Sequence, residues 1–304
     1  MRKGQTLADS HLVHYQHVEL FSHELQMKEE CILAVFVKFH LQTVFELDLN
    51  LVFPEECGLR PALDVHRVTH GSEVTILGEA PWQVALYANG VRFICGASII
   101  ANDWILTAAH CVEDFYWDSP FQIQAGTLTH DTAGQVHEVS EIFKHPLFDS
   151  FSLGYDIALL KLSTPLNFTD AVQPVCLPPP GDHLPEVGSY VTFTGWGSFG
   201  EMRGPITRNL QKARAPVIPN NICQRSLTGF HVLPSMFCTM YDTGYQDTCT
   251  GDVGGPQVQE VNGRWTIYGI TSWETVCGKA YSPSGKTRVS SFIDFIYKTI
   301  REDD

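Results

Sequence analysis

The sequence predicts an all-β protein of sandwich or paired-barrel type, and three observations support this. Short apolar stretches recur from Cys57 onward, separated by clusters of Gly, Pro, Asn and Asp. These stretches do not alternate with long helical patterns, which argues against a parallel α/β sheet. Hydrophobic residues make up 44% of the 304-residue chain and charged residues 18%, so most of the chain can bury a core.

The first segment, residues 1–56, differs in composition from the remainder. It contains a short apolar run, Ile32 to Val37, of the length found at the centre of a signal peptide. This run follows Glu29 and Glu30 and lacks a small-residue cleavage site. We therefore expect residues 1–56 to be an N-terminal extension, either a leader or pro region or a poorly ordered tail. No apolar run approaches the ~20 residues that span a bilayer.

The expected elements follow in order along the rest of the chain. The expected strands are Trp82–Tyr87, Ile99–Ile100, Trp104–Ala109, Ile157–Leu162, Tyr190–Gly195 and Trp265–Thr271. The proline run Pro178–Pro180 is expected to connect two halves. Residues Ser291–Ile300 place Phe292, Phe295 and Ile296 near helical spacing, which predicts a terminal amphipathic helix.

Charge and cysteine usage exclude several classes of protein. With 34 acidic and 20 basic side chains, the formal charge is −14, which argues against general binding to nucleic acid or anionic lipid. The nine cysteines form no CxxC pair and no zinc-finger spacing with histidine, which indicates disulfides and an oxidising compartment, with no metal. Cys31 lies apart from the others and is the expected unpaired one. The sequon at Asn167 fits a secreted glycoprotein.

Three ordered segments carry the chemistry. They are Leu106–Cys111 with His110, Tyr155–Leu162 with Asp156, and the glycine turn Gly251–Pro256. Further matching segments are Pro81–Val84, Cys95–Ile99, Cys176–Pro178, Thr194–Gly197 and Thr271–Trp273. Together they resemble the trypsin-like serine peptidase family, from Cys57 to about Ile300.

The resemblance implies a chymotrypsin-type fold, with two six-stranded antiparallel β-barrels, the site in the crevice between them, and a C-terminal helix. It implies a propeptide at residues 57–67 and a peptidase domain at residues 68–304. The implied disulfides are Cys57–Cys176, Cys95–Cys111, Cys223–Cys238 and Cys249–Cys277. No cofactor is implied. We expect no calcium site, because the loop Gly126–Val139 supplies only Asp131 and Glu138 as carboxylates.

The resemblance also assigns the catalytic positions. His110 corresponds to the base and Asp156 to the carboxylate that orients it, while Val253 stands where the family has its nucleophilic serine. Valine has no proton to give and no lone pair, and loss of this nucleophile costs about a millionfold in turnover, or about 8 kcal/mol. The backbone donors of Gly251 and Val253 could still form an oxyanion hole. Thr248, Thr250 and Ser272 are not expected to replace the nucleophile.

The predicted specificity pocket is altered as well. Asp247 matches the carboxylate that binds substrate Arg or Lys in trypsin-like members. The other pocket positions are Ser272, Trp273, Glu274, Ser284 and Lys286. Glu274 and Ser284 replace glycines, and Lys286 replaces an aromatic residue. Lys286 is expected either to pair with Asp247 and fill the pocket or to point to solvent.

An activation site is predicted at Arg67. Cleavage there would free the Val68 ammonium to pair with Asp252 and order the oxyanion loop. His70 replaces a usual glycine, and the alternative is that Arg67 is an ordinary exposed loop residue.

The sequence thus predicts a secreted, non-catalytic serine protease homologue that binds proteases, inhibitors or other components of a proteolytic cascade. One alternative is an active endopeptidase that cleaves after Arg or Lys. Another is a trap that holds peptides or inhibitors in the intact crevice.

Overall fold

The structure is a computed structural model that describes residues 56–61, 72–113, 120–131, 134–198, 205–242, 251–277 and 279–303. Nearly all of the expected N-terminal extension lies outside these ranges. The predicted site residues Arg67, Val68, Asp247 and Cys249 also lie outside them.

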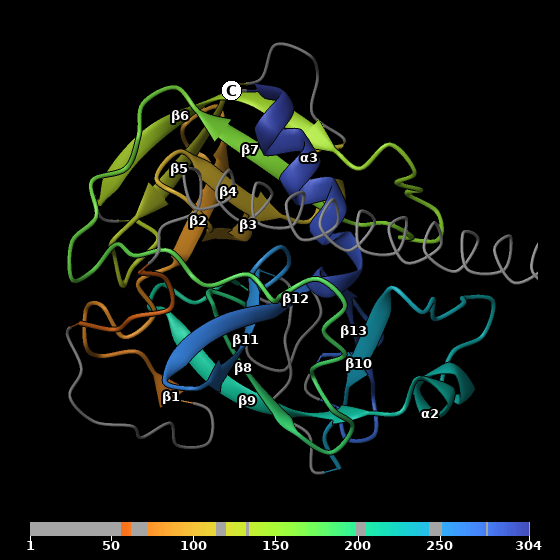
Figure 1. The fold of residues 1–304 in the computed structure, drawn as a ribbon. Coiled ribbons are helices and arrows are strands. Elements are labelled where there is room, and N and C mark those ends of the chain that lie inside the picture. The colour runs from red at the N-terminus through yellow and green to blue at the C-terminus, as the bar shows by residue number, and fades with distance from the viewer. Residues whose placement is uncertain are drawn as a thin grey trace, which may run out of the picture. The chain divides into compact units, whose positions relative to one another are not determined.

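The first half of the described chain forms a closed antiparallel barrel, drawn in the upper part of Figure 1. Around the barrel its strands are β2 (Gln83–Ala88), β3 (Arg92–Ile99), β4 (Trp104–Thr107), β7 (Ala158–Leu162), β6 (Gln135–Lys144) and β5 (Phe121–Ala125). Closure leaves these six strands without an unpaired edge. Aliphatic side chains of β2, β4 and β7 fill the interior.

The second half forms a seven-stranded sheet that also closes. Its order is β1 (Ser72–Glu73), β9 (Gln211–Ile218), β10 (Met236–Thr239), β13 (Ser284–Arg288), β12 (Arg264–Glu274), β11 (Pro256–Val261) and β8 (Tyr190–Gly195). Strand β8 pairs with β9 as well as with β11, so six strands close and β1 is attached outside, on β9. The predicted pair of six-stranded barrels is therefore confirmed.

Four short helical segments accompany the strands in the described residues. They are η1 (Ala109–Val112), α2 (Asn220–Arg225), η2 (Val289–Phe292) and α3 (Ile293–Asp303). The chain enters the C-terminal helix through η2, so α3 begins and ends slightly later than the sequence predicts. Its residues Ile296 and Ile300 are buried, and Asp303 pairs with Lys161 of β7 at 3.1 Å. The helix thus returns to the first barrel, beside which it lies in Figure 1.

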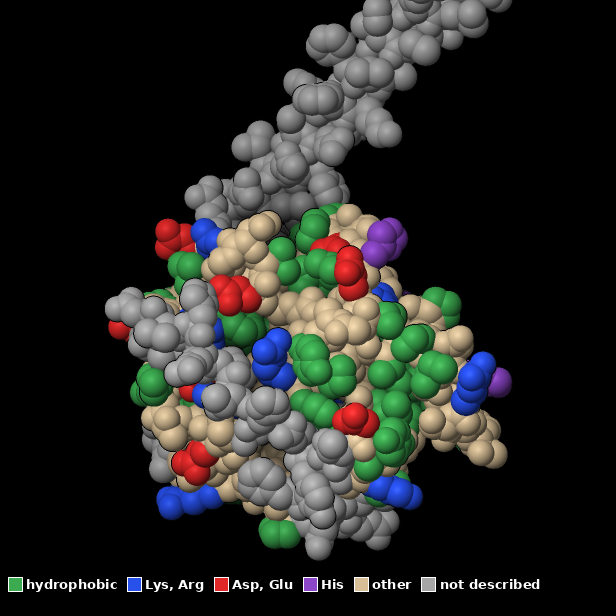
Figure 2. Space-filling model, turned by 90° about the horizontal axis from the view of Figure 1, so that it is seen from below, with side chains coloured by type: hydrophobic (Ala, Val, Ile, Leu, Met, Phe, Trp, Pro, Cys, Tyr) green, Lys and Arg blue, Asp and Glu red, His purple; other side chains and the backbone are tan. Residues whose placement is uncertain are grey.

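Disulfides and buried tryptophans fix the connections between these elements. Three of the four predicted disulfides are present: Cys57–Cys176, Cys95–Cys111 and Cys223–Cys238. Cys277 is also disulfide-bonded, and its predicted partner Cys249 lies outside the described residues. Trp82, Trp104 and Trp196 are each at most 2% exposed. On the face drawn in Figure 2, acidic and basic side chains lie singly among apolar ones, without a field of one sign.

Candidate functional site

The imidazole of His110 is held at the end of the first barrel. His110 lies in the short helix η1, directly after β4, and the next residue, Cys111, is tied to Cys95 of β3. Its Nδ1 lies 2.8 Å from Oδ2 of Asp156. The side chain of His110 is 28% exposed and that of Asp156 is fully buried. A buried carboxylate at Nδ1 favours the tautomer with its proton on that nitrogen, which leaves Nε2 able to accept a proton.

Asp156 connects the two barrels. Its Oδ1 accepts a hydrogen bond from the backbone N–H of His110 at 3.0 Å, and its Oδ2 also accepts one from the hydroxyl of Ser272 in β12. Its backbone carbonyl accepts a hydrogen bond from the hydroxyl of Thr287 in β13 at 2.8 Å. A buried carboxylate needs such donors, because desolvation strongly disfavours an unpartnered charge.

The glycine turn that carries Val253 packs against the first barrel. Gly254 has a φ of +79°, and a Cβ there would lie 2.4 Å from the carbonyl oxygen of Gly96 and 3.1 Å from Sγ of Cys111. The turn is fixed further because Gly96 N–H donates to the carbonyl of Val253 at 2.7 Å. Gly254, which follows Val253, therefore packs against Cys111, which follows His110. Val253 is half-buried and lies at the boundary of the barrels, where its carbonyl bonds to Gly96 of β3. Gly251, also in the turn, has a φ of +102°.

Asp252, in the same turn, is only 7% exposed. Its Oδ1 accepts a hydrogen bond from Gly197 N–H at 2.9 Å. A side chain at Gly197 would collide with this carboxylate, because a Cβ there would lie 2.2 Å from Oδ2. The predicted partner Val68 and the predicted cleavage site at Arg67 lie outside the described residues.

Lys286 is fully buried inside the second barrel. Its Nζ donates to the hydroxyl of Ser284 at 2.8 Å, and that hydroxyl lies 3.0 Å from the hydroxyl of Thr239. Ser284 and Thr239 are at most 1% exposed. Of the two expectations for Lys286, the one that points it to solvent is wrong, because its position in β13 turns it inward. Asp247 lies outside the described residues.

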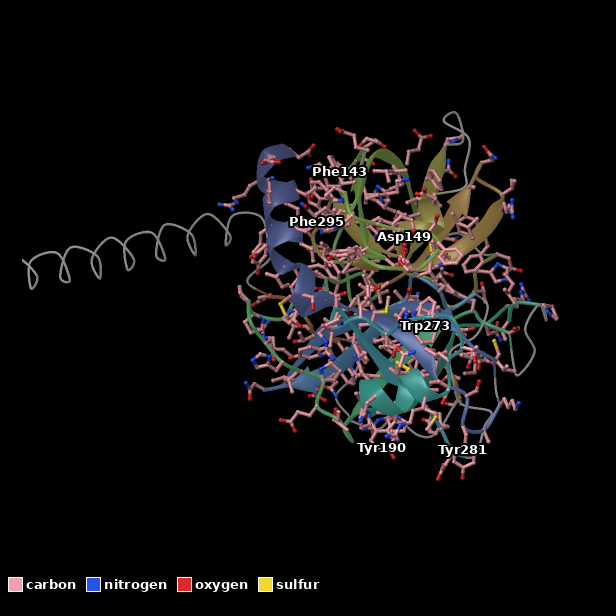
Figure 3. The ribbon with its side chains drawn as sticks, turned by 90° about the vertical axis from the view of Figure 1, so that its right-hand side faces the viewer. Phe143, Asp149, Tyr190, Trp273, Tyr281 and Phe295 are labelled. Atoms are coloured by element: carbon pink, nitrogen blue, oxygen red, sulfur yellow. A yellow bond between two sulfur atoms is a disulfide. The ribbon has the colours of Figure 1, made fainter. Side chains whose placement is uncertain are left out.

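Trp273 and Glu274 are the last two residues of strand β12. Trp273 is 8% exposed and packs edge-on against Phe230, with ring centroids 4.8 Å apart. Its ring covers Gly285, where a Cβ would lie within 1.9 Å of it. Glu274 is half-buried and pairs in register with Ser284. Figure 3 shows Trp273 near the boundary between the barrels, close to the loop that carries Asp149.

Sequence reasoning missed two residues of this region, Thr287 and Phe230. Thr287 donates a hydrogen bond to the carbonyl of Asp156, and Phe230 packs against Trp273. In both pairs the partner is far away in the chain, and no local sequence pattern identifies such a contact.

The described ranges contain no group of three or more His, Cys, Asp or Glu side chains placed to hold a metal ion. No helix within them is both long and apolar enough to cross a membrane. Asn167 of the sequon is exposed.

The fold and this arrangement of His110, Asp156 and the glycine turn define a class of protein, and comparison with known proteins gives the same class. Residues 69–296 match the family model described as Trypsin, so the chain belongs to the trypsin family.

Two curated relatives are similar over most of the chain. Transmembrane protease serine 9 of Rattus norvegicus is 39% identical over 251 residues, which are 81% of this chain and 23% of the relative. Coagulation factor XI of Bos taurus is 36% identical over 235 residues, which are 76% of this chain and 37% of the relative. The chain therefore spans well under half the length of either relative.

Proposed function

We propose that this chain is a secreted trypsin-family protein without peptidase activity, which acts by binding other proteins of a proteolytic cascade. The observation that carries the proposal is that valine occupies position 253 in the glycine turn, where the family resemblance expects the nucleophilic serine. A coagulation factor among the relatives supports a role in a cascade. Three disulfides in the described chain support an oxidising, extracellular setting.

A change at this one position is expected to be enough to remove activity, for a chemical reason. The His110–Asp156 pair is arranged to accept a proton, but the isopropyl group of Val253 has none to give. Backbone donors of Gly251 and Val253 can polarise a carbonyl, yet an oxyanion hole alone leaves only about 10³–10⁴-fold acceleration over water. The pair then serves mainly to hold the barrels together.

The buried ammonium of Lys286 supports a second loss, that of the pocket for basic residues. It donates a hydrogen bond to Ser284, one of the predicted pocket residues, and its side chain has no contact with water. We propose that it neutralises Asp247, so that the carboxylate no longer attracts substrate Arg or Lys. A cation at this depth repels a second cation, because charges interact strongly where water is excluded.

Reversion at both positions tests these two losses separately. The full chain would be treated with an activating protease and then with a fluorophosphonate probe and a basic amide substrate. We expect no labelling of the wild type or of Val253→Ala. We expect Val253→Ser to label but to cleave the basic substrate poorly, and Val253→Ser/Lys286→Tyr to cleave it faster.

The controls decide between the candidate functions. Labelling of Val253→Ser must disappear when His110→Ala is added. Labelling and turnover by the wild-type chain, abolished by His110→Ala, would establish the active endopeptidase instead. Stable capture of a Kunitz-type inhibitor by the unlabelled wild type would favour the inhibitor trap.

We further propose that the chain is processed after Arg67 and remains in one covalent piece. Cys57 precedes this site and is bonded to Cys176 in the body of the domain, so the expected propeptide at residues 57–67 would stay attached. Secreted material should show a smaller band only after reduction, and N-terminal sequencing should find Val68. An intact chain under activating conditions would contradict this.

Glycosylation at Asn167 is proposed on its exposure and its sequon. Treatment with an amidase that removes N-glycans should lower the apparent mass of secreted protein. The Asn167→Gln variant should show no change.

A further inference from the structure

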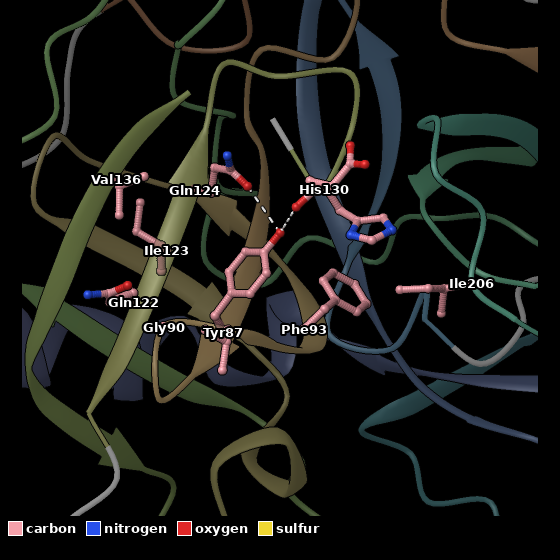
Figure 4. Close-up of a pocket in the computed structure, with 11 residues that line it drawn as sticks. Tyr87, Gly90, Phe93, Gln122, Ile123, Gln124, His130, Val136 and Ile206 are labelled. Atoms are coloured by element: carbon pink, nitrogen blue, oxygen red, sulfur yellow. Dashed lines mark hydrogen bonds between the residues drawn. The ribbon is translucent and has the colours of Figure 1, made fainter. Parts of the chain in front are cut away.

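A further concave site is lined mainly by residues of the first barrel, and His110 is not among its described lining residues. It is a cavity of about 640 Å³, within the size range of ligand sites. Figure 4 shows its walls, which come from the β2–β3 hairpin, β5, the β5–β6 loop with His130 and Asp131, and β6, with Ile206 from the second half of the chain. Segments far apart in the chain therefore build one hollow, and none of its described lining residues belongs to the catalytic arrangement.

Aromatic rings line one side of the cavity. Phe93 lies between Tyr87, at 5.9 Å between ring centroids, and His130, at 5.6 Å. Phe93 also packs edge-on against the buried Trp196 at 6.0 Å, which fixes its ring. A pre-positioned set of aromatic faces presents negative electrostatic potential to a ligand, and this favours cations.

The polar groups of the cavity also favour a donor of hydrogen bonds. The hydroxyl of Tyr87 contacts Oε1 of Gln124 at 3.0 Å and the carbonyl oxygen of His130. The Asp131 carboxylate lies at the rim, and no Lys or Arg is among the described residues that line the cavity. Burial, reinforced by the charge of Asp131, raises the pKa of Tyr87 to about 12, so this hydroxyl stays neutral.

The Asp131 carboxylate can bind a ligand with little loss of stability, because its present ion pair with Arg208 is exposed. It pairs with Arg208 at 2.8 Å, but the two side chains are 45% and 68% exposed. Exposed ion pairs of this kind contribute little to stability, so an incoming cation can replace Arg208. Two apolar side chains flank the opening, Val91 at 84% and Val136 at 54% exposed. Such exposed aliphatic groups suit a long apolar stem.

We propose that this cavity, formed around Tyr87, Phe93, His130 and Asp131, binds an arginine side chain presented by a partner protein. Arginine combines the matching parts: a flat cation that stacks on aromatic rings, fixed hydrogen-bond donors, and an apolar stem. An acidic segment would meet Asp131 and the overall charge of −14. A purely apolar segment would leave the carboxylate without a new partner. The inference deepens the proposed binding function by naming what the partner presents.

A peptide pair tests the proposal on the full chain. The probes are acetylated, amidated Gly-Gly-Arg-Gly and the same peptide with citrulline, a neutral isostere of arginine. Binding is followed by ligand-detected NMR titration at low and high salt. We expect the arginine peptide to bind about threefold to tenfold more tightly than the citrulline peptide, and less tightly at high salt.

Matched variants test whether the arginine peptide binds at this cavity. Asp131→Asn and Phe93→Leu should each weaken arginine binding about threefold to tenfold, whereas Phe93→Tyr should retain it. Asp294→Asn makes the same charge change on helix α3 and should leave binding unchanged. Melting temperatures within a few degrees of wild type would show that the variants are folded.

Three results would overturn the inference. One is equal binding of the arginine and citrulline peptides, and another is tighter binding of a Gly-Gly-Phe-Gly peptide. The third is loss of arginine binding in Asp247→Asn but not in Asp131→Asn, which would move the ligand to the specificity pocket. None of these results bears on the absence of catalysis, which the reversion at Val253 tests independently.

Discussion

Removing the carboxylate of Asp156 should strongly destabilise the fold even though the proposed protein has no catalysis to lose. This side chain is fully buried and accepts three hydrogen bonds, from the backbone and ring nitrogens of His110 and from the Ser272 hydroxyl. Hydrogen bonds to charged groups contribute about 1.5–3 kcal/mol each, and deleting one partner of a buried polar network costs about 3–5 kcal/mol. Relief of the buried charge offsets part of this, so we expect Asp156→Ala to cost about 3–5 kcal/mol.

Asp156→Asn separates hydrogen bonding from volume. An amide can accept from the backbone of His110 and, if the imidazole changes tautomer, donate to Nδ1. We therefore expect a loss of only about 1–2 kcal/mol. The exposed Asp170 is the control, and Asp170→Ala should change stability by at most about 0.5 kcal/mol.

The assay is urea unfolding followed by tryptophan fluorescence, with the disulfides intact. With a slope of about 2–3 kcal/mol per molar urea, Asp156→Ala should lower the midpoint by about 1–2.5 M. A loss below about 1 kcal/mol, or equal losses for the alanine and asparagine variants, would refute the structural role assigned to this network.

Three further predictions concern pH, the glycine turn and a disulfide. Burial lowers the pKa of His145, whose Nδ1 accepts a hydrogen bond from Leu147 N–H at 3.2 Å, so the folded state binds the proton less well than the unfolded state. Stability should therefore fall as pH drops through about 6.5 towards the lowered folded value, and urea midpoints of His145→Asn should show a weaker fall. Gly254→Ala should lose at least about 1–3 kcal/mol from backbone strain alone, measured by the same unfolding. The double variant Cys57→Ser/Cys176→Ser removes a disulfide between residues 119 apart in the chain and should lower the free energy of unfolding by about 2–5 kcal/mol. An unchanged melting temperature would contradict this expectation.

The sequence alone determined the features that depend on residue identity and local order. Short apolar stretches predicted six of the thirteen strands in the described residues, most with shifted ends, and helical spacing near Phe292 predicted a terminal helix, displaced by only a few residues. The order of His110, Asp156 and the glycine turn, taken with the family resemblance, predicted the pair of barrels. The presence of valine at position 253 is likewise a property of the sequence, and it carries the proposed loss of catalysis.

Tertiary structure decided which side chains meet. Ser272 and Thr287 reach Asp156 across 116 and 131 residues of chain, and no local pattern records such distances. The inward position of Lys286 follows from the register of β13 against β10 and β12, because a shift of one residue would turn it to the other face. The cavity around Phe93 likewise exists only once the barrel has closed and brought β2, β5 and β6 together. Local periodicity depends on neighbouring residues and can therefore be seen in the sequence. These contacts depend on how strands far apart in the chain pair and pack.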